Sequence, residues 1–178
     1  EDGVERYEVR IRLQDREGLI YPPRFLELAN QHGLGEKIDR WVCTQSLHLL
    51  ATRNNPALKL TVNLTHNSLF SSEFLPWLRG QLQQERIKAD QISLQISELD
   101  IVSSPEQVTR FCEQIKTLGF ILSITHFGCT YSSFISKPLE QASFVKLDRS
   151  LLRDIDTDSA QREKLYSAVS SLHAMGLL

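Results

Sequence analysis

Hydrophobic and polar residues alternate along three short segments of the chain, and two further segments have the composition of strands. Such alternation is typical of strands that place one face in a core and leave the other face polar. We expect strands over residues 7–13 (YEVRIRL), 58–65 (LKLTVNLT), 92–97 (ISLQIS), 120–125 (FILSIT) and 144–150 (FVKLDRS). On the first strand, the apolar side chains expected to pack against helices are Tyr7, Val9, Ile11 and Leu13.

The segments between and after these strands carry hydrophobic residues every three or four positions, which is the spacing of one helix face. We expect helices over residues 36–53, 71–86, 104–119 and about 160–175. In the first helix, the stripe expected to face the core comprises Ile38, Trp41, Val42, Leu49 and Leu50. Strands that alternate with helices through short connections favour a mainly parallel sheet.

The second face of the expected strands is consistently polar, with Asn63 and Thr65 on one strand and Ser93 and Gln95 on the next. A doubly wound sheet is covered by helices on both faces, so its strands are hydrophobic almost throughout. The interior of a (β/α) barrel near the carboxyl ends of its strands can instead hold polar side chains and a ligand. We therefore predict an α/β fold with a TIM-type barrel. The alternative is an antiparallel sheet with one solvent-exposed face, although the helical connections argue against it.

The composition excludes several classes of function. The chain has 178 residues, of which 41% are hydrophobic, and a formal net charge of −2, which provides no basic face for DNA or RNA. No apolar run reaches the roughly 18–20 residues of a membrane span, and the charged first residues are not a signal peptide. The scattered Cys43, Cys112 and Cys129 are expected to be free thiols, and the expected localisation is cytoplasmic.

Six stretches, in order along nearly the whole chain, resemble motifs of the EAL domain family. They are YEVRIRL (7–13), PPRFLELANQHGLGEKIDRWV (22–42), TVNLTHNSL (61–69), LQISELD (94–100), ITHFGCTYSSF (124–134) and FVKLDRSLLRDI (144–155). The first resembles the strand E-A-L-L-R-W that gives the family its name. The resemblance implies a (β/α)8-like barrel that hydrolyses or binds the bacterial second messenger cyclic di-GMP.

The resemblance also implies that the barrel is incomplete in this chain, with its first strand and its last strands missing. An open barrel exposes unpaired strand edges, which is unfavourable for an independent folding unit. We therefore expect residues 1–178 to form a partial EAL domain within a larger multidomain signalling protein.

Active members of this family use two divalent metal ions, and the resemblance assigns the metal-binding positions to particular residues. The positions, with a nearby lysine, are Glu8, Asn63, Gln95, Thr125, His126 and Lys146. Gln95 replaces a Glu of the family, while Thr125 and His126 replace a pair of Asp residues. Hard cations are held chiefly by carboxylate oxygens, so three lost carboxylates leave little to bind them. We expect no catalytic residues, no bound metal and no requirement for Mg²⁺.

The resemblance assigns nucleotide binding to a further group of side chains. Arg12 matches the family's phosphate contact, and Asp39 matches a position that contacts guanine; the alternative for Asp39 is a solvated helix carboxylate beside Arg40. Arg10 replaces a Leu and would add a cation over a phosphate, stack on a base or crowd the site. Glu98 is expected to stabilise the loop at 127–133. The full set of expected ligand-binding residues is Glu8, Arg10, Arg12, Asp39, Asn63 and Lys146.

The function predicted from the sequence is that of a catalytically inactive EAL domain that binds cyclic di-GMP as a receptor. The pattern most resembles family members that control type IV pilus assembly and twitching through a PilZ-family adaptor, or surface adhesion through another partner. Two alternatives stay open: a protein-interaction scaffold that no longer binds nucleotide, and a weak residual phosphodiesterase. A homodimer is also left open.

Overall fold

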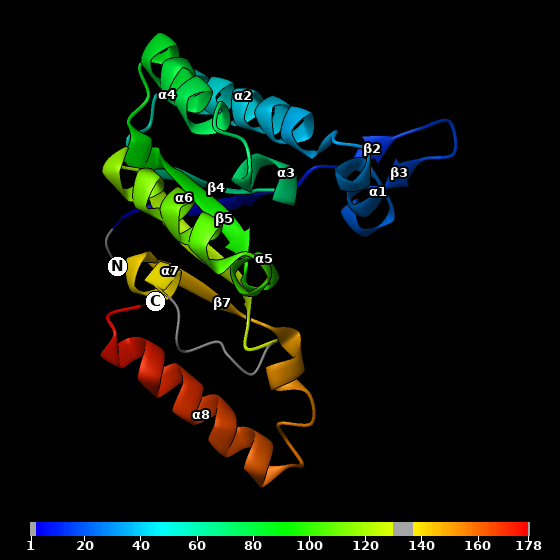
Figure 1. Cartoon of the computed structure of the whole chain (residues 1–178), viewed down its shortest axis with the longest axis vertical. Helices are drawn as coiled ribbons and strands as arrows, with labels where there is room; N and C mark the ends of the chain where they lie inside the picture. The colour runs from blue at the N-terminus through cyan, green and yellow to red at the C-terminus, as the bar shows by residue number, and fades with distance from the viewer. Residues whose placement is uncertain (1–2, 130–136, 178) are drawn as a thin grey trace. The chain divides into compact units, whose positions relative to one another are not determined.

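The computed structural model describes residues 3–129 and 137–177 of the chain (Figure 1). The chain divides into two compact units, Glu1–Leu94 with Thr117–Ile121 and Gln95–Lys116 with Leu122–Leu178. Among the described residues, the strands of the main sheet are hydrogen-bonded in the order β1-β4-β5-β6-β7. The boundary between the units runs within β5 (Ile92–Ser97) and β6 (Ile121–Phe127), so each unit is described separately.

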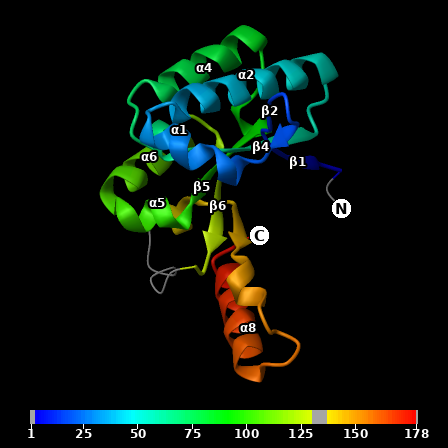
Figure 2. The same cartoon turned by 90° about the vertical axis from the view of Figure 1, so that its right-hand side faces the viewer.

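The first unit is built on two parallel strands, β1 (Glu5–Val9) and β4 (Leu58–Asn63), with Glu8 opposite Thr61. The connection between them contains β2 (Leu13–Gln14), β3 (Leu19–Ile20), η1 (Pro22–Arg24), α1 (Leu26–Gln31) and α2 (Gly35–Arg53). After β4 come α3 (His66–Leu69), α4 (Phe74–Glu85) and η2 (Ala89–Gln91). The long helices α2 and α4 lie side by side in Figure 1 and again in Figure 2.

Helix α2 buries a different stripe from the expected one. Val42 and Leu50 are buried as predicted, but Trp41 and Leu49 are 57% and 42% exposed. The helix turns by about 100° per residue, and its buried line runs through Asp39, Cys43, Ser46 and Leu50, which places position 41 on the other side. Polar residues within the buried line therefore misled the prediction.

The strand expected over residues 7–13 is shorter than predicted, because β1 ends at Val9 and Leu13 begins a two-stranded antiparallel hairpin. The side chain of Asp15 accepts hydrogen bonds from the backbone N–H groups of Glu17 and Gly18, at 2.8 and 3.0 Å. Gly18 has a φ of 132°, which glycine adopts without strain. The expectation that Tyr7 and Leu13 pack against helices is wrong, since they are 57% and 47% exposed.

The second unit contains the carboxyl end of β5, followed by α5 (Glu98–Ser103) and α6 (Pro105–Thr117). Strand β6 pairs in parallel with β7 (Phe144–Leu147), and α7 (Lys137–Gln141) lies between them in the sequence. The chain then continues through η3 (Arg149–Leu152) to α8 (Ser159–Ala174). The helices predicted over 104–119 and about 160–175 are confirmed by α6 and α8. Parallel pairing in both units excludes the antiparallel sheet that the sequence left open.

The start of α2 offers a sharp test of packing, because Gly35 lies in a polar cradle. Its N–H donates to Asn67 Oδ1 at 2.9 Å, and a Cβ atom at this position would collide with oxygen atoms of Asn30, Thr65 and Asn67. We expect Gly35→Ala to lower the free energy of unfolding by about 1–3 kcal/mol in urea denaturation. Gly80→Ala, in α4 with open space around it, is the matched control and should raise it by roughly 0.5–1 kcal/mol. A neutral Gly35→Ala would contradict the packing described.

Candidate functional site

Three of the expected site residues meet at the carboxyl ends of β1 and β4. Asn63 Nδ2 donates to Glu8 Oε1 at 3.0 Å, and Arg10 Nη2 donates to Glu8 Oε2 at 3.3 Å. We call these three residues the Glu8 cluster. The side chain of Glu8 is 21% exposed and that of Arg10 is 64% exposed. Both oxygens of the carboxylate therefore already receive a hydrogen bond from within the first unit.

Arg12 lies in the segment between β1 and β2, where the strand has left the sheet. Its Nη1 donates to the backbone oxygen of Ile11 at 2.7 Å, and its guanidinium carbon lies 4.6 Å from the ring centroid of Tyr21. Within the residues that the structure describes, it has no carboxylate partner. The charge of this half-buried side chain is thus held in place by an aromatic ring without being neutralised, which suits it to bind an anion.

Asp39 is a buried hydrogen-bonding centre within the first unit. Its Oδ2 accepts three hydrogen bonds, from Thr65 N at 2.7 Å, Thr65 Oγ1 at 2.8 Å and Ser68 Oγ at 2.6 Å. Desolvation raises the pKa of this carboxyl to about 6, although the three hydrogen bonds act to lower it. These bonds connect α2 to Thr65, in the loop after β4, and to Ser68 in α3.

This position corrects one interpretation of the sequence. Asp39 is 2% exposed, so the alternative of a solvated helix carboxylate beside Arg40 is wrong. Arg40 instead pairs with Glu36 at 2.6 Å and lies over the ring of Trp77. A direct contact between Asp39 and guanine would require the carboxylate to leave its three donors.

In the second unit, Thr125 and His126 replace the family's pair of Asp residues. They lie at an irregularity in the pairing of β6 with β7. The register between β6 and β7 shifts between Ile124 and Phe127, and His126 has a φ of 59°. Such bulges redirect side chains, and a positive φ is uncommon for a residue other than glycine. His126 Nδ1 lies 3.0 Å from Asp148 Oδ2, while Thr125 is half-buried.

Asp148 is held by the residues that follow it as well as by His126. Hydrogen bonds from the side chain and backbone of Ser150, and a further one from His126, lower the pKa of Asp148 to about 2. Because His126 binds to this carboxylate through Nδ1, the structure gives that nitrogen a partner within the protein.

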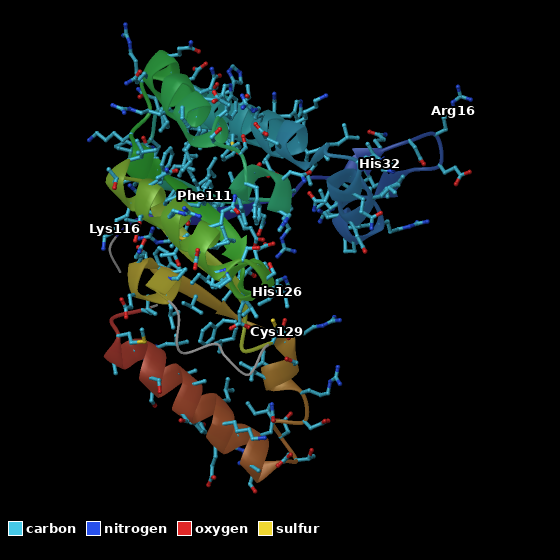
Figure 3. All side chains as sticks on the ribbon, viewed as in Figure 1. Arg16, His32, Phe111, Lys116, His126 and Cys129 are labelled. Carbon is cyan, nitrogen blue, oxygen red and sulfur yellow. The ribbon has the colours of Figure 1, made fainter. Side chains whose placement is uncertain are left out.

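The remaining expected residues of the second unit lie on β5, α5 and β7. Gln95 is buried, and its Oε1 accepts a hydrogen bond from Ser123 Oγ at 3.2 Å. Glu98 is also buried, and its Oε2 accepts one from Cys129 Sγ at 3.1 Å. Lys146 is exposed on β7. Cys129 lies two residues after the end of β6, and its N–H donates to the backbone oxygen of His126 at 3.2 Å (both residues are labelled in Figure 3).

The Glu98–Cys129 contact reaches the beginning of the loop that Glu98 is expected to stabilise. Desolvation, followed by the hydrogen bond to Glu98 and its negative charge, raises the pKa of the Cys129 thiol to about 12. The thiol therefore stays protonated and acts as a donor. Residues 130–136 of this loop lie outside the described residues.

Few of the residues at the family's metal positions carry a negative charge in this chain. No group of three or more His, Cys, Asp or Glu side chains in residues 3–129 and 137–177 is arranged to hold a metal ion. The Glu8 carboxylate faces a guanidinium that would repel a cation, and Gln95 Oε1 is a neutral oxygen that already accepts a hydrogen bond. Hard cations are held chiefly by anionic oxygen ligands, and Glu8 alone among these positions supplies one.

Several residues of the site were not found by sequence reasoning. Asp148 and Ser150 lie in the matched stretch FVKLDRS, and Thr65 and Ser68 lie in TVNLTHNSL, yet only the structure shows which residues they contact. The Asp-x-Ser spacing at 148 and 150 is typical of a side chain that accepts from the backbone two residues on, which was an available signal. Tyr21 gave no such signal, because its contact with Arg12 depends on the hairpin between them.

A parallel α/β sheet with polar residues at the carboxyl ends of its strands defines the general class of this protein, and comparison with known proteins gives the family. The family model described as EAL domain matches residues 1–178. The chain belongs to the EAL domain family.

Relatives with known names support this assignment. The chain is 27% identical over 169 residues to the cyclic di-GMP phosphodiesterase PdeF of Escherichia coli (strain K12), covering 93% of this chain and 22% of that protein. It is 28% identical over 164 residues to the cyclic di-GMP phosphodiesterase NbdA of Pseudomonas aeruginosa, covering 90% of this chain and 21% of that protein. The chain thus spans about a fifth of the length of these curated relatives.

A solved structure resembles the whole chain. The FimX EAL domain from Pseudomonas aeruginosa, bound to cyclic di-GMP, matches with a TM-score of 0.90 and 34% identity over 100% of this chain and 72% of that chain. The predicted α/β fold of the TIM-barrel-like EAL type, incomplete in this chain, is confirmed by this match. Among the described residues, no helix is long and apolar enough to cross a membrane.

The raised pKa of Asp39 predicts a pH-dependent stability. Folding raises this pKa from 3.8 to about 6, so the protonated carboxyl favours the folded state. This contribution is complete below the unfolded value and is lost as the pH rises through about 6, at a cost of up to about 3 kcal/mol. Asp39→Asn, which stays neutral, should therefore gain stability relative to wild type between about pH 4 and pH 7 in urea denaturation.

The surface substitution Asp156→Asn is the matched control for this experiment. It should stay within about 0.5 kcal/mol of wild type. A difference between Asp39→Asn and wild type that does not change with pH would contradict the raised pKa of Asp39.

Proposed function

We propose that this chain is a catalytically inactive EAL domain that binds cyclic di-GMP as a receptor. The observation that carries the proposal is the state of the Glu8 carboxylate, whose two oxygens accept hydrogen bonds from Asn63 and Arg10. Neutral Gln95 and Thr125, and His126 bound to Asp148, add no anionic ligand at the family's other metal positions. A phosphodiester can bind such a site, but no metal-bound hydroxide is generated to cleave it.

The nucleotide would be held chiefly by its charged phosphates. Arg12 carries a positive charge that Tyr21 positions from one face, and a guanidinium can form two parallel hydrogen bonds with a phosphate. The similarity of the whole chain to a FimX EAL domain bound to cyclic di-GMP supports the same ligand. The remaining expected contacts are Glu8, Arg10, Asn63 and Lys146, while Asp39 would act through the loop after β4.

As a receptor without catalysis, the domain would act through another protein. We propose that it is one module of a larger cytoplasmic signalling protein that controls type IV pilus assembly or surface adhesion, with a PilZ-family adaptor as one partner. Mg²⁺ would not be required for the nucleotide to bind.

Calorimetric titration of cyclic di-GMP in EDTA tests the receptor function. We expect saturable binding by the wild-type protein and a loss of at least about tenfold in affinity for Arg12→Ala, since about 1.4 kcal/mol or more is lost with a charged hydrogen bond. Arg16 lies in the turn between β2 and β3 and points away from the domain (Figure 3), so Arg16→Ala is the control and should bind as wild type does. If the wild-type protein releases no heat at tens of micromolar nucleotide, on the order expected for such receptors, the proposal is wrong.

A weak phosphodiesterase is the second candidate, because the relatives PdeF and NbdA are named as phosphodiesterases. Incubation of cyclic di-GMP with the protein and Mg²⁺ or Mn²⁺, followed by chromatography for the linear product, should give no turnover above a buffer control. Turnover that disappears in Glu8→Ala would establish residual catalysis and contradict the inactive assignment.

A further inference from the structure

Arg10 is the residue of the Glu8 cluster that the fold does not need for its stability. Its side chain is 64% exposed, and its contact with Glu8, at 3.3 Å, is the one polar partner that the structure gives it within the described residues. A pair this exposed contributes little to stability, roughly 0.2–1 kcal/mol. The chain therefore carries a cation at this place that folding does not need.

The chemistry of the cluster suggests what this cation is for. A carboxylate such as Glu8 repels a phosphodiester unless a positive charge lies between them. Arg10 supplies one positive charge, and its guanidinium donates a hydrogen bond to the Glu8 carboxylate, which is itself held by Asn63. Since a guanidinium has five N–H donors, most of them remain for a ligand after the bond to Glu8 is made.

We propose that Arg10 replaces a divalent cation at Glu8, so that a phosphate of the nucleotide binds to a guanidinium built into the chain. This inference rests on the proposed receptor function and explains how the site could bind its ligand without metal. Arg10 replaces only one of the two roles of a metal ion. A guanidinium attracts phosphate as a metal ion does, but it does not lower the pKa of a bound water toward neutrality. The same side chain would therefore favour binding and leave hydrolysis without a nucleophile.

A planar guanidinium could instead stack on a guanine base, and the choice of substitution separates the two roles. Arg10→Lys keeps the positive charge and loses the plane, whereas Arg10→Leu loses both and introduces the residue found in the family's signature strand. If the charge matters, Lys retains most of the affinity. If stacking matters, Lys is as weak as Leu.

The test is calorimetric titration of cyclic di-GMP into the purified protein, with each variant measured in EDTA and in excess Mg²⁺. Wild type should bind with the same Kd in both. Arg10→Leu should lose at least about tenfold in EDTA, equivalent to about 1.4 kcal/mol, while Arg10→Lys should stay within about threefold of wild type. Mg²⁺ should restore part of the affinity of Arg10→Leu, and this gain should vanish when Glu8→Gln is added. Arg16→Leu is the matched control and should bind as wild type does.

Three results would overturn the role of Arg10: equal affinity of Arg10→Leu and wild type in EDTA, equal weakness of Lys and Leu, or an equal gain from Mg²⁺ in wild type and Arg10→Leu. Absence of heat in every variant, wild type included, would instead remove the receptor function and this inference with it. Circular dichroism and thermal denaturation verify that each variant is folded, which the exposure of Arg10 leads us to expect.

Discussion

The carboxylate of Glu8 can hold a metal ion or a guanidinium, but not both in the same place. In this chain the amide of Asn63 binds one oxygen and the guanidinium of Arg10 binds the other. A divalent cation entering here would have to displace Arg10 or lie beside its positive charge. The proposed separation of nucleotide binding from cleavage follows from this single electrostatic conflict.

Much of the fold could be predicted from the sequence, because strands and helices with one apolar face leave a periodic pattern. The strands β4, β5 and β6 and the helices α6 and α8 fall close to their predicted positions. The hairpin after β1 could not be placed in this way. It depends on a short turn at Asp15 and Gly18, while the apolar residues around it, such as Leu13, continue the alternation of the strand but stay exposed.

The sequence predicted which residues belong to the site, but not the contacts that these residues make. The resemblance to the family gave Glu8, Asn63 and Arg10 as neighbours in function, and the parallel pairing of β1 with β4 brings them together. The bond between His126 and Asp148 was not foreseen, because it arises where the register of β6 and β7 shifts. The burial of Asp39 was missed for a similar reason: its donors, Thr65 and Ser68, lie far away in the sequence.

The central claim is that the side chains at the family's metal positions in this chain carry too little negative charge to bind a pair of divalent cations. Titration of the nucleotide-bound protein with Mn²⁺, followed by electron paramagnetic resonance of the free ion, counts the bound ions directly. The account predicts that the free Mn²⁺ signal rises in proportion to the metal added, with no site filled at micromolar concentrations. Two Mn²⁺ ions bound per chain, and released by Glu8→Gln, would contradict it.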